Sequence, residues 1–466
     1  MNQIEVFNFD SNVMITFRIV CVGLSTLGQE LSYANVERKT KVMSKLLEEI
    51  LSKDNIAVAI KQVKANKGKP GVDKMTTEEV ENYFKENGEI INSMIRARKY
   101  KPLPVKRVEI PKGDGTKRPL GIPSVKDRVL QQAIVQVISP KCEEVFSNYS
   151  YGFRPKRRCE NAVVKALEYF NDGYDWIVDL DLSKFFDNVN QDILMILVHN
   201  IIKDGDTESL IRKFLQSGVN IGGTISQTKI GTPQGGNLSP LLANIYLNEL
   251  DKELKKRELR FTRYADDVLI CVKSEVAANR VMTSVTKWLK EKLRVEVNAT
   301  KTKVARPNDI KYLGFGFYKD KETERWKPKP HIKSIEKFKK KLHDETIRSV
   351  STSIAFKISK LNPIIRGWIN YFRISSMKKE MVKLDRYVRI RIRMCIWKQW
   401  KTPQKKMKSL IKLGINKNRA KRMAYSRKGP MRCVNNQVVC FALRNDILKK
   451  KGLLSLVDHY QLVHNL

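Results

Sequence analysis

Two sets of aspartates, far apart in the sequence, are the side chains whose type and spacing could do chemistry. Asp266 and Asp267 are adjacent and lie between two apolar runs, while Asp179 and Asp181 alternate with apolar residues in the stretch 176–182. Adjacent carboxylates between apolar strands are costly unless they are exposed, protonated or bound to a metal ion. If the two stretches form neighbouring strands, Asp181 and Asp266 converge on one cation site. Phosphoryl transfer needs such a site, with two Mg²⁺ ions held by carboxylates.

A glycine-rich segment lies between the two acidic stretches and reads GTPQGGNLSP over residues 231–240. Its glycines allow the backbone to approach a ligand closely, and Gln234 offers an amide to a base or a sugar. Each feature alone has an ordinary interpretation, because Asp-Asp pairs and glycine-rich loops are common in turns. Their order along one chain makes the combination much more specific.

The hydrophobic pattern predicts the elements that must position these side chains. Alternation predicts a β-hairpin with a basic rim, with strands at 105–110 and from 118 onward and a turn at 111–116. Further strands are predicted at 175–182 and 311–318, with a strand–turn–strand unit over 260–272. Helices are predicted from a start near Met43, as two patterns within 76–98, and at 127–138, 162–170 and 240–256.

The C-terminal third has a helical pattern after a stretch at 327–330 that resembles a linker. Asn362 is predicted to cap a helix whose first residue is Pro363. The next helix carries Arg386, Arg389 and Arg393 at helical spacing. Residues 401–466 are predicted to form short basic helices and a small hairpin.

The composition indicates a polyanionic partner. The chain has 466 residues, 42% of them hydrophobic, so two to four domains with sizeable cores are expected. Its net charge is +40, and residues 331–466 hold 34 basic and 7 acidic residues, a net charge of +27. Nucleic acid is the leading partner, an anionic membrane surface the second and an acidic protein the third.

The cysteines and the apolar segments favour a cytoplasmic protein. Seven cysteines are dispersed without the spacing of a zinc site, as in a reduced cytosolic protein. The apolar stretch 13–24 is interrupted by Arg18, is too short to span a bilayer and follows no basic segment. We expect no membrane partner.

Seven motifs in order resemble the reverse transcriptases encoded by bacterial and organellar group II introns. The resemblance runs from about Leu46 to Tyr460. The matching strings lie at 118–123, 151–155, 181–187, 232–240, 264–267, 298–302 and 312–315. Any one of them could arise by chance, but seven in the family's order effectively could not.

The resemblance implies an α+β right-hand polymerase. Fingers and palm, with an antiparallel palm sheet plus helices, would be followed by an α-helical thumb or maturase domain and a small basic DNA-binding segment. The implied boundaries are 1–42 for an extension that is either disordered or a non-native start, 43–175 for the N-terminal region and fingers, 176–325 for the palm, 331–400 for the thumb and 401–466 for the DNA-binding segment. Residues 433–441 depart from the family's pattern.

The resemblance also implies a role for individual residues. Asp181, Asp266 and Asp267 match the catalytic carboxylates that bind two Mg²⁺ ions, for which Mn²⁺ can substitute. Asp179 is not required by the family, and a local salt bridge is the preferred interpretation. The residues matching the nucleotide-binding positions are Lys112, Arg118, Phe186, Gln234 and Lys301. Those matching primer, template and RNA contacts are Tyr312, Gly314, Arg386, Arg389 and Arg393.

Two of these assignments have rivals in the sequence. Phe186 matches the aromatic gate that excludes a 2′-hydroxyl, with Phe185 as the expected core residue. Lys303 is a rival to Lys301.

The expected function is that of a multifunctional intron protein. It would bind its group II intron RNA, assist splicing, and copy the intron from an RNA template with a DNA primer and dNTPs at a DNA target. It would be cytoplasmic, associated with the nucleoid when bound to target DNA. No His/Cys-rich endonuclease domain is recognised, as in the endonuclease-lacking, group IIC-like lineage. The alternatives are a non-catalytic RNA-folding factor and a reverse transcriptase domesticated for phage defence or diversity generation.

Overall fold

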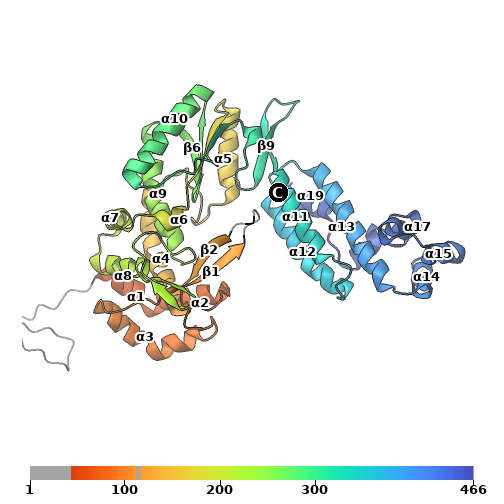
Figure 1. Cartoon of the computed structure of the whole chain (residues 1–466), viewed down its shortest axis with the longest axis horizontal. Helices are drawn as coiled ribbons and strands as arrows, with labels where there is room; N and C mark the ends of the chain where they lie inside the picture. Colours follow the sequence, from red (N-terminus) through yellow and green to blue (C-terminus); the bar gives the residue numbers. More distant parts are fainter. Residues whose placement is uncertain (1–43, 112–114, 116, 465–466) are drawn as a thin grey trace, which may run out of the picture.

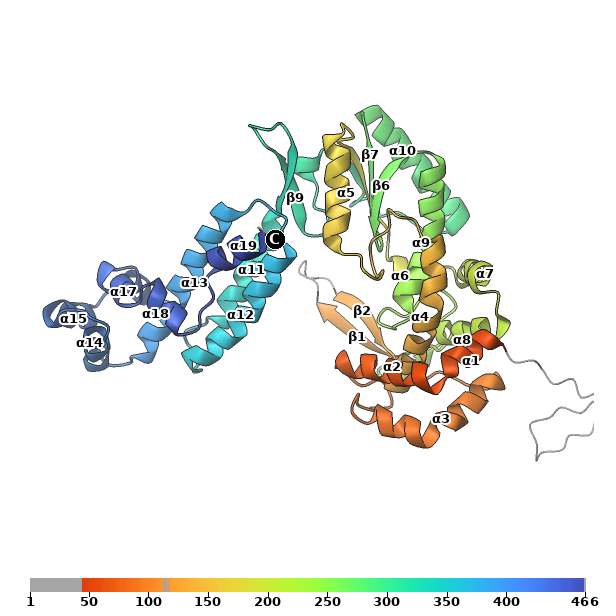
Figure 2. The same cartoon turned by 180° about the vertical axis from the view of Figure 1, so that it is seen from behind.

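The computed structural model describes residues 44–111, 115 and 117–464. Figure 1 shows an N-terminal body of helices and two sheets, and a C-terminal helical region that extends away from it; Figure 2 shows the same arrangement from behind. The predicted extension at 1–42 and Lys112 lie outside the described residues.

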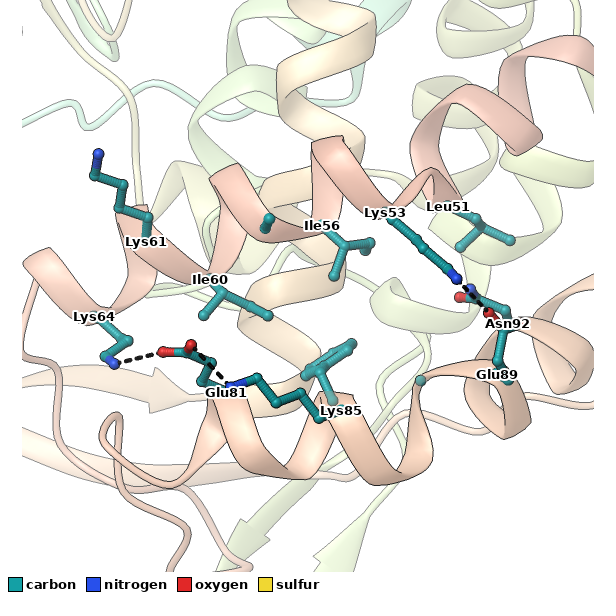
Figure 3. Close-up of a pocket in the computed structure, with 13 residues that line it drawn as sticks. Leu51, Lys53, Ile56, Ile60, Lys61, Lys64, Glu81, Lys85, Glu89 and Asn92 are labelled. Carbon is teal, nitrogen blue, oxygen red and sulfur yellow. Dashed lines mark hydrogen bonds and ion pairs between the residues drawn. The ribbon is translucent and has the colours of Figure 1, made fainter.

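Three helices begin the described chain, α1 (Lys45–Leu51), α2 (Lys53–Ala65) and α3 (Val80–Arg96). Ser44 caps α1 by accepting from the Leu47 amide, and Ser52 caps α2 by accepting from the Asn55 amide. The two helical patterns predicted within 76–98 are one helix, α3, preceded by turns. Between α2 and α3 lies a groove of about 650 Å³ with an apolar floor that includes Ile60. Ion pairs at its rim, including Lys64 with Glu81, are drawn in Figure 3.

The predicted basic hairpin is confirmed. Strands β1 (Val105–Pro111) and β2 (Lys117–Ile122) pair in antiparallel fashion. Their sheet has the order β2-β1-β4-β5 and includes β4 (Val219–Ile221) and β5 (Thr224–Ser226). Helices α4 (Val125–Val145), α5 (Cys159–Asn171), α6 (Phe185–Asn188), α7 (Gln191–Ile202), α8 (Gly205–Leu215) and α9 (Ser239–Lys256) surround the two sheets.

The second sheet carries the aspartates and has the order β6-β7-β3-β8. Its strands are β6 (Arg260–Tyr264), β7 (Asp267–Val272), β3 (Trp176–Asp181) and β8 (Lys303–Ala305), and all neighbours are antiparallel. The condition on which the predicted cation site depends, that the two acidic stretches are neighbouring strands, is met by the β3–β7 pairing.

The two faces of this sheet belong to different hydrophobic cores. One face, with Val178 and Ile270, joins the N-terminal core, which includes residues of α10 (Glu275–Trp288) and the following π-helical turn Leu289–Leu293. The opposite face, with Ile177 and Leu269, packs with α5 and shares a core with the C-terminal helices. Because side chains alternate along a strand, Asp179 and Asp181 share one face of β3, and it is this second face, with Ile177.

Two predictions at the junction with the C-terminal region are wrong. The supposed linker at 327–330 is part of strand β10 (Trp326–Pro330), which pairs with β9 (Phe315–Lys319). Proline is tolerated there because β10 is an edge strand. The strand predicted at 311–318 begins only at Phe315, after the short 3₁₀ turn Pro307–Asp309 and a tight turn at Leu313 and Gly314.

The C-terminal region is helical throughout its described part. Its helices are α11 (Ile332–Glu345), α12 (Ile354–Tyr371), α13 (Lys378–Gln399), α14 (Pro403–Lys412), α15 (Lys417–Ala424), α16 (Pro430–Val434), α17 (Gln437–Ala442), α18 (Asn445–Lys450) and α19 (Leu456–His464). The small hairpin predicted within 401–466 is therefore not formed in the described part of that stretch, up to residue 464. None of the described helices combines the length and the apolar character that crossing a membrane requires.

The predicted cap at Asn362 is also wrong. Helix α12 begins at Ile354 with Ser353 as its cap, and Pro363 lies inside the helix. The Asn362 side chain instead donates to the Gly452 carbonyl and accepts from the Leu454 amide. It thus ties α12 to the segment before α19.

Candidate active site at the acidic edge of the central sheet

Four aspartates gather where β3 ends and β7 begins. Asp181 lies directly opposite Asp267 in the β3–β7 register. Tyr264 pairs with Asp267 across β6 and β7, so Ala265 and Asp266 form the connecting turn. Ala265 has a φ of 57°, which places this tight turn in the left-handed region.

The electrostatics of this edge show mutual repulsion among the carboxylates. The pKa of Asp267 is raised to about 6, by partial desolvation first and then by the negative charges of Asp266, Asp179 and Asp181. The Asp267 side chain is nevertheless exposed to solvent. Burial, with a smaller contribution from Asp181, likewise raises the pKa of Asp179 to about 6.

The local salt bridge expected for Asp179 does not form with any residue that the structure describes. Lys303 lies directly opposite Asp179 on β8, but its ammonium donates to the Asp309 carbonyl at 2.5 Å. The positive charge of Lys303 lowers the pKa of Asp179, but the two side chains do not form an ion pair.

Lys301 is the cation that reaches the acidic edge. Its Nζ lies 3.4 Å from Asp181 Oδ2. The backbone on either side of Lys301 is fixed to β3. The backbone N–H of Asn298 donates to the Asp181 carbonyl at 2.8 Å, and the backbone N–H of Asp181 donates to Thr302 Oγ1 at 3.2 Å. Of the two candidate lysines, the structure therefore places Lys301 beside the predicted carboxylate.

The glycine-rich loop bridges the acidic sheet and the basic hairpin. The Thr232 amide donates to the Phe186 carbonyl at 2.7 Å. At the other end, the Gly121 amide donates to the Gln234 carbonyl at 2.8 Å, and Arg118 Nε donates to Gln234 Oε1 at 3.2 Å. The loop therefore brings Arg118, Phe186 and Gln234 into one assembly.

Glycine is required where this loop touches its neighbours. Gly231 has a φ of 85°, and a Cβ there would lie 2.7 Å from the Asp187 carbonyl oxygen. Gly235 has a φ of 130°, and a Cβ would lie 2.4 Å from the Gly121 carbonyl oxygen. Both contacts are with backbone, which cannot move aside cheaply. The sequence predicted that these glycines let the loop approach a ligand closely. In the structure, Gly231 and Gly235 instead let the loop pack closely against the backbone of neighbouring segments.

Both phenylalanines after β3 are buried. Phe185 is 2% exposed and Phe186 is 8% exposed, and their ring centroids are 5.4 Å apart. Phe185 is a core residue, as predicted, while Phe186 is also packed within the same core.

Tyr312 and Gly314 hold the sheet against the C-terminal helices. Tyr312 is buried, with its hydroxyl 3.4 Å from Thr262 Oγ1 on β6. Gly314 has a φ of 83°, and its carbonyl accepts from the His331 amide at 3.0 Å and from Ser334 Oγ at 2.8 Å. This turn is therefore a joint between the acidic sheet and α11.

The three arginines of α13 do not share one environment. Arg386 is exposed. Arg389 is paired with Asp385 at 2.7 Å, and Arg393 Nε donates to the Leu443 carbonyl at 3.0 Å. Two of the three predicted RNA contacts thus already have partners within the protein.

A buried ion pair beneath the Ala265–Asp266 turn was not found from the sequence. Arg263 and Asp251 are both fully buried and paired through two hydrogen bonds of 2.7 and 2.5 Å. Arg263 Nη1 also donates to Asn244 Oδ1 at 3.0 Å and to the Ala265 carbonyl at 2.9 Å. The network links α9 directly to the acidic turn.

Gly152 contacts two members of the same network, Ala265 and Asn244. A Cβ at Gly152 would lie 2.3 Å from the Ala265 amide nitrogen, and the Gly152 carbonyl accepts from Asn244 Nδ2 at 2.8 Å. The sequence of β6, RFTRY, contains two arginines, of which Arg260 is exposed and Arg263 is buried, so charge alone does not single out Arg263. Its partner on α9 could not be read from spacing.

The acidic edge fits a divalent cation by its chemistry. Carboxylate oxygens suit Mg²⁺, and a cation would relieve the repulsion that raises the pKa of Asp267. No group of three or more His, Cys, Asp or Glu side chains in the described residues forms a ready-made metal cage. Mg²⁺ usually takes one or two protein carboxylates, and waters and substrate phosphates fill its other positions.

Two family matches cover most of the described chain. "Reverse transcriptase (RNA-dependent DNA polymerase)" matches residues 110–317, and "Group II intron, maturase-specific domain" matches residues 335–414. The chain is thus a mixed α and β protein with a reverse transcriptase domain and a helical maturase region. Polymerases of this family generally use divalent metal ions.

Two individual proteins, YkfC and LtrA, support the same assignment. Protein YkfC of Escherichia coli (strain K12) is 31% identical over 307 residues, which is 57% of this chain and 81% of YkfC. Group II intron-encoded protein LtrA of Lactococcus lactis subsp. cremoris is 35% identical over 236 residues, which is 50% of this chain. This match spans 39% of the length of LtrA. A chain of the solved "Partial Cas6-RT-Cas1--Cas2 complex" has a TM-score of 0.36 and 22% identity, over 57% of this chain and 46% of that one. The resemblance found in the sequence is confirmed, and the chain belongs to the group II intron-encoded reverse transcriptases that carry a maturase domain.

Proposed function

We propose that the protein is an RNA-directed DNA polymerase that copies an intron RNA into cDNA and also binds that RNA to assist its splicing. The observation that supports this most strongly is the register of the acidic sheet. Asp181 faces Asp267 across two neighbouring strands, with Asp266 in the adjoining turn. A loop with Gln234 joins this edge to a basic hairpin that carries Arg118.

Asp181 and Asp266 are the proposed ligands of two Mg²⁺ ions, with Asp267 as a weaker ligand or hydrogen-bonding support. When bound by such carboxylates, divalent ions neutralise charge on the attacking and leaving oxygens of phosphoryl transfer, and Mn²⁺ can substitute for Mg²⁺. Lys301 Nζ lies 3.4 Å from Asp181 Oδ2, and its side chain is exposed. Its ammonium can therefore reach a triphosphate bound at this edge.

The nucleotide would lie between the hairpin and the acidic edge. Arg118 supplies a fork for the triphosphate, and Lys112, outside the described residues, is proposed as a second cation. Gln234 is fixed through its backbone carbonyl, so its amide can face the base or sugar. Phe186 is the proposed gate against a 2′-hydroxyl, and its carbonyl anchors the same loop.

The finer architecture follows the right-hand plan. Residues 43–175 would form the N-terminal region and fingers, 176–325 the palm, 331–400 the thumb and 401–466 the DNA-binding segment. The turn with Tyr312 and Gly314 would then hold the primer end where palm and thumb meet. Its hydrogen bonds to His331 and Ser334 support a placement at this joint.

Intron RNA and target DNA are proposed to bind the C-terminal helices, because residues 331–466 carry +27 of the chain's net charge of +40. The maturase region implies RNA binding, and Arg386 is exposed on α13. Arg389 and Arg393 would reach RNA only by giving up the partners they have in this structure.

Primer extension on an RNA template tests the proposal. With a DNA primer, dNTPs and Mg²⁺, the chain should synthesise cDNA, and Asp266→Ala should abolish synthesis while leaving RNA affinity nearly unchanged. The substitution removes a proposed metal ligand and not an RNA contact. Tight RNA binding without cDNA synthesis by the unaltered chain would instead indicate a non-catalytic RNA-folding factor. Undiminished synthesis by the variant would overturn the metal-site assignment.

A further inference from the structure

A strongly cationic cavity lies in the C-terminal region, away from the acidic edge. It has a volume of about 490 Å³ and is enclosed by the loop between α11 and α12, the end of α13, and the segments around α14 and α16. Figure 1 shows α14 at the outer end of the molecule, with α13 between it and the N-terminal body. Six cationic side chains line it: Arg348, Lys357, Lys398, Lys401, Lys406 and Lys428. Among its described lining residues none is Asp or Glu.

The charges of this cavity are not neutralised within the protein. In the part of the chain that the structure describes, none of the six cations forms an ion pair. Arg348, Lys398, Lys401 and Lys428 are exposed at its margin. Like charges gathered around a concave surface repel one another and focus a positive potential into it. An anion would relieve that repulsion.

Two of the cations are fixed in the wall. Lys357 is 4% exposed, and its Nζ donates to the Ile347 carbonyl at 3.0 Å. An ammonium has three donors, so further hydrogen bonds remain available to a ligand. Lys406 Nζ lies over the Trp397 ring, 4.9 Å from its centroid.

The loop that closes the cavity is held in place by α13. Gln399 Nε2 donates to the Thr352 carbonyl at 2.7 Å, and Arg391 Nε donates to Thr346 Oγ1 at 3.1 Å. Cys395 Sγ contacts the Thr346 carbonyl at 3.3 Å. The cavity is thus preformed, which lowers the entropic cost of binding a ligand.

We propose that this cavity is a phosphate-binding site for the backbone of a nucleic acid strand. Its volume is within the range of ligand pockets, and lysines act on phosphate as point charges. Trp397 is only 5% exposed and its face is covered by Lys406, so no aromatic platform is open to a base. Recognition would therefore be independent of sequence and common to RNA and DNA. The inference rests on the proposed function only in taking nucleic acid as the source of the phosphate.

The test is the salt dependence of oligonucleotide binding. Labelled single strands of roughly 12 nucleotides, one RNA and one DNA of the same sequence, are titrated with the full chain without dNTPs or metal. The cavity variant combines Lys398→Gln, Lys401→Gln and Lys428→Gln. The matched control combines Lys412→Gln, Lys417→Gln and Lys421→Gln, which are exposed, unpaired among the described residues and outside the cavity.

The cavity variant should bind both strands at least about tenfold more weakly at moderate salt. Its slope of log K against log salt should be shallower by roughly 0.7 for each phosphate that the substituted side chains no longer bind. The control should be weakened much less. A charge-preserving triple, with arginine at the same three positions, should bind nearly normally and so exclude misfolding as the cause.

Three results would overturn the proposal. Equal weakening in the cavity variant and the control would show a diffuse basic surface, and an unchanged slope would show that phosphates do not enter. Weaker binding of RNA alone would show recognition of the 2′-hydroxyl instead of the backbone. Failure of the unaltered chain to make cDNA would remove the proposed polymerase function and leave these binding results intact.

Discussion

At the scale of single residues, Asp267 shows what the acidic edge requires. Its pKa of about 6 lies well above the ordinary value for Asp, because desolvation and the charges of Asp266, Asp179 and Asp181 penalise its ionised form. Above that pH the native protein holds these like charges together at a cost in stability. A bound cation would remove this repulsion. The four carboxylates are therefore arranged in a way that favours cation binding at a cost to the stability of the protein alone.

This balance predicts how Mg²⁺ stabilisation depends on pH. Because the folded pKa is raised, the native state takes up a proton more readily than the unfolded state, and the metal-free protein gains stability as pH falls toward and below about 6. Mg²⁺ must displace that proton, so its increase of the melting temperature should be large at about pH 7.5 and small at about pH 5.

Thermal unfolding with and without Mg²⁺ at both pH values checks this. Asp267→Asn serves as the control, and it should reduce the effect of Mg²⁺ at the higher pH. An equal increase in melting temperature at both pH values would contradict the account of Asp267.

At the scale of elements, the β6–β7 turn depends on helix α9. Arg263 and Asp251 are fully buried, and Arg263 reaches from β6 to the Ala265 carbonyl within the turn. Removing one member of a buried ion pair leaves an uncompensated charge, whereas replacing both by apolar residues is often nearly neutral. The pair can therefore be tested for a positioning role separately from its effect on stability.

Arg263→Met should lower the free energy of unfolding by roughly 3–5 kcal/mol, measured by denaturant titration. The double variant Arg263→Met with Asp251→Leu should recover most of that stability. It should not recover cDNA synthesis, because the Ala265 carbonyl still lacks its donor and the turn with Asp266 is no longer held. Recovery of both stability and synthesis in the double variant would show that the pair is only structural.

The sequence was sufficient to predict elements that are determined by local hydrophobic patterns. It was not sufficient where the structure of a segment depends on contacts with residues far away in the chain. Alternation predicted β3, and the apolar runs around Asp266 and Asp267 predicted a strand–turn–strand unit. That the two acidic strands are neighbours was only a condition of the predicted cation site, and the β3–β7 pairing meets it. Residues 327–330 resembled a linker because their prolines break most strands, but an edge strand accepts them. Asn362 before Pro363 resembled a helix cap, but its side chain binds the backbone of residues 452 and 454.

The same limit applies to the site. Helical spacing placed Arg389 and Arg393 on one helix, and the family resemblance implied RNA contacts for them. Neither indicates that Asp385 pairs with Arg389 or that Arg393 donates to the Leu443 carbonyl. The role of Arg263 was missed because it depends on the ion pair with Asp251, which forms only when the fold brings α9 under β6.

At the scale of the whole molecule, charge is divided between two functions. Residues 331–466 carry a net charge of +27, while the first 330 carry +13 and contain the acidic edge. The sheet with that edge has one face in the N-terminal core and the other in the core shared with the C-terminal helices. The proposed polymerase site is thus attached directly to the region proposed to hold nucleic acid.

The central claim is that Asp181 is a catalytic carboxylate on a strand where Asp179, two residues earlier on the same face, is not. Single-turnover incorporation of one nucleotide on an RNA template compares Asp181→Asn with Asp179→Asn, a matched change of charge and shape. The account predicts that Asp181→Asn eliminates incorporation while Asp179→Asn retains most of it, with RNA affinity unchanged in both. Equal activity of the two variants, whether both active or both inactive, would contradict it.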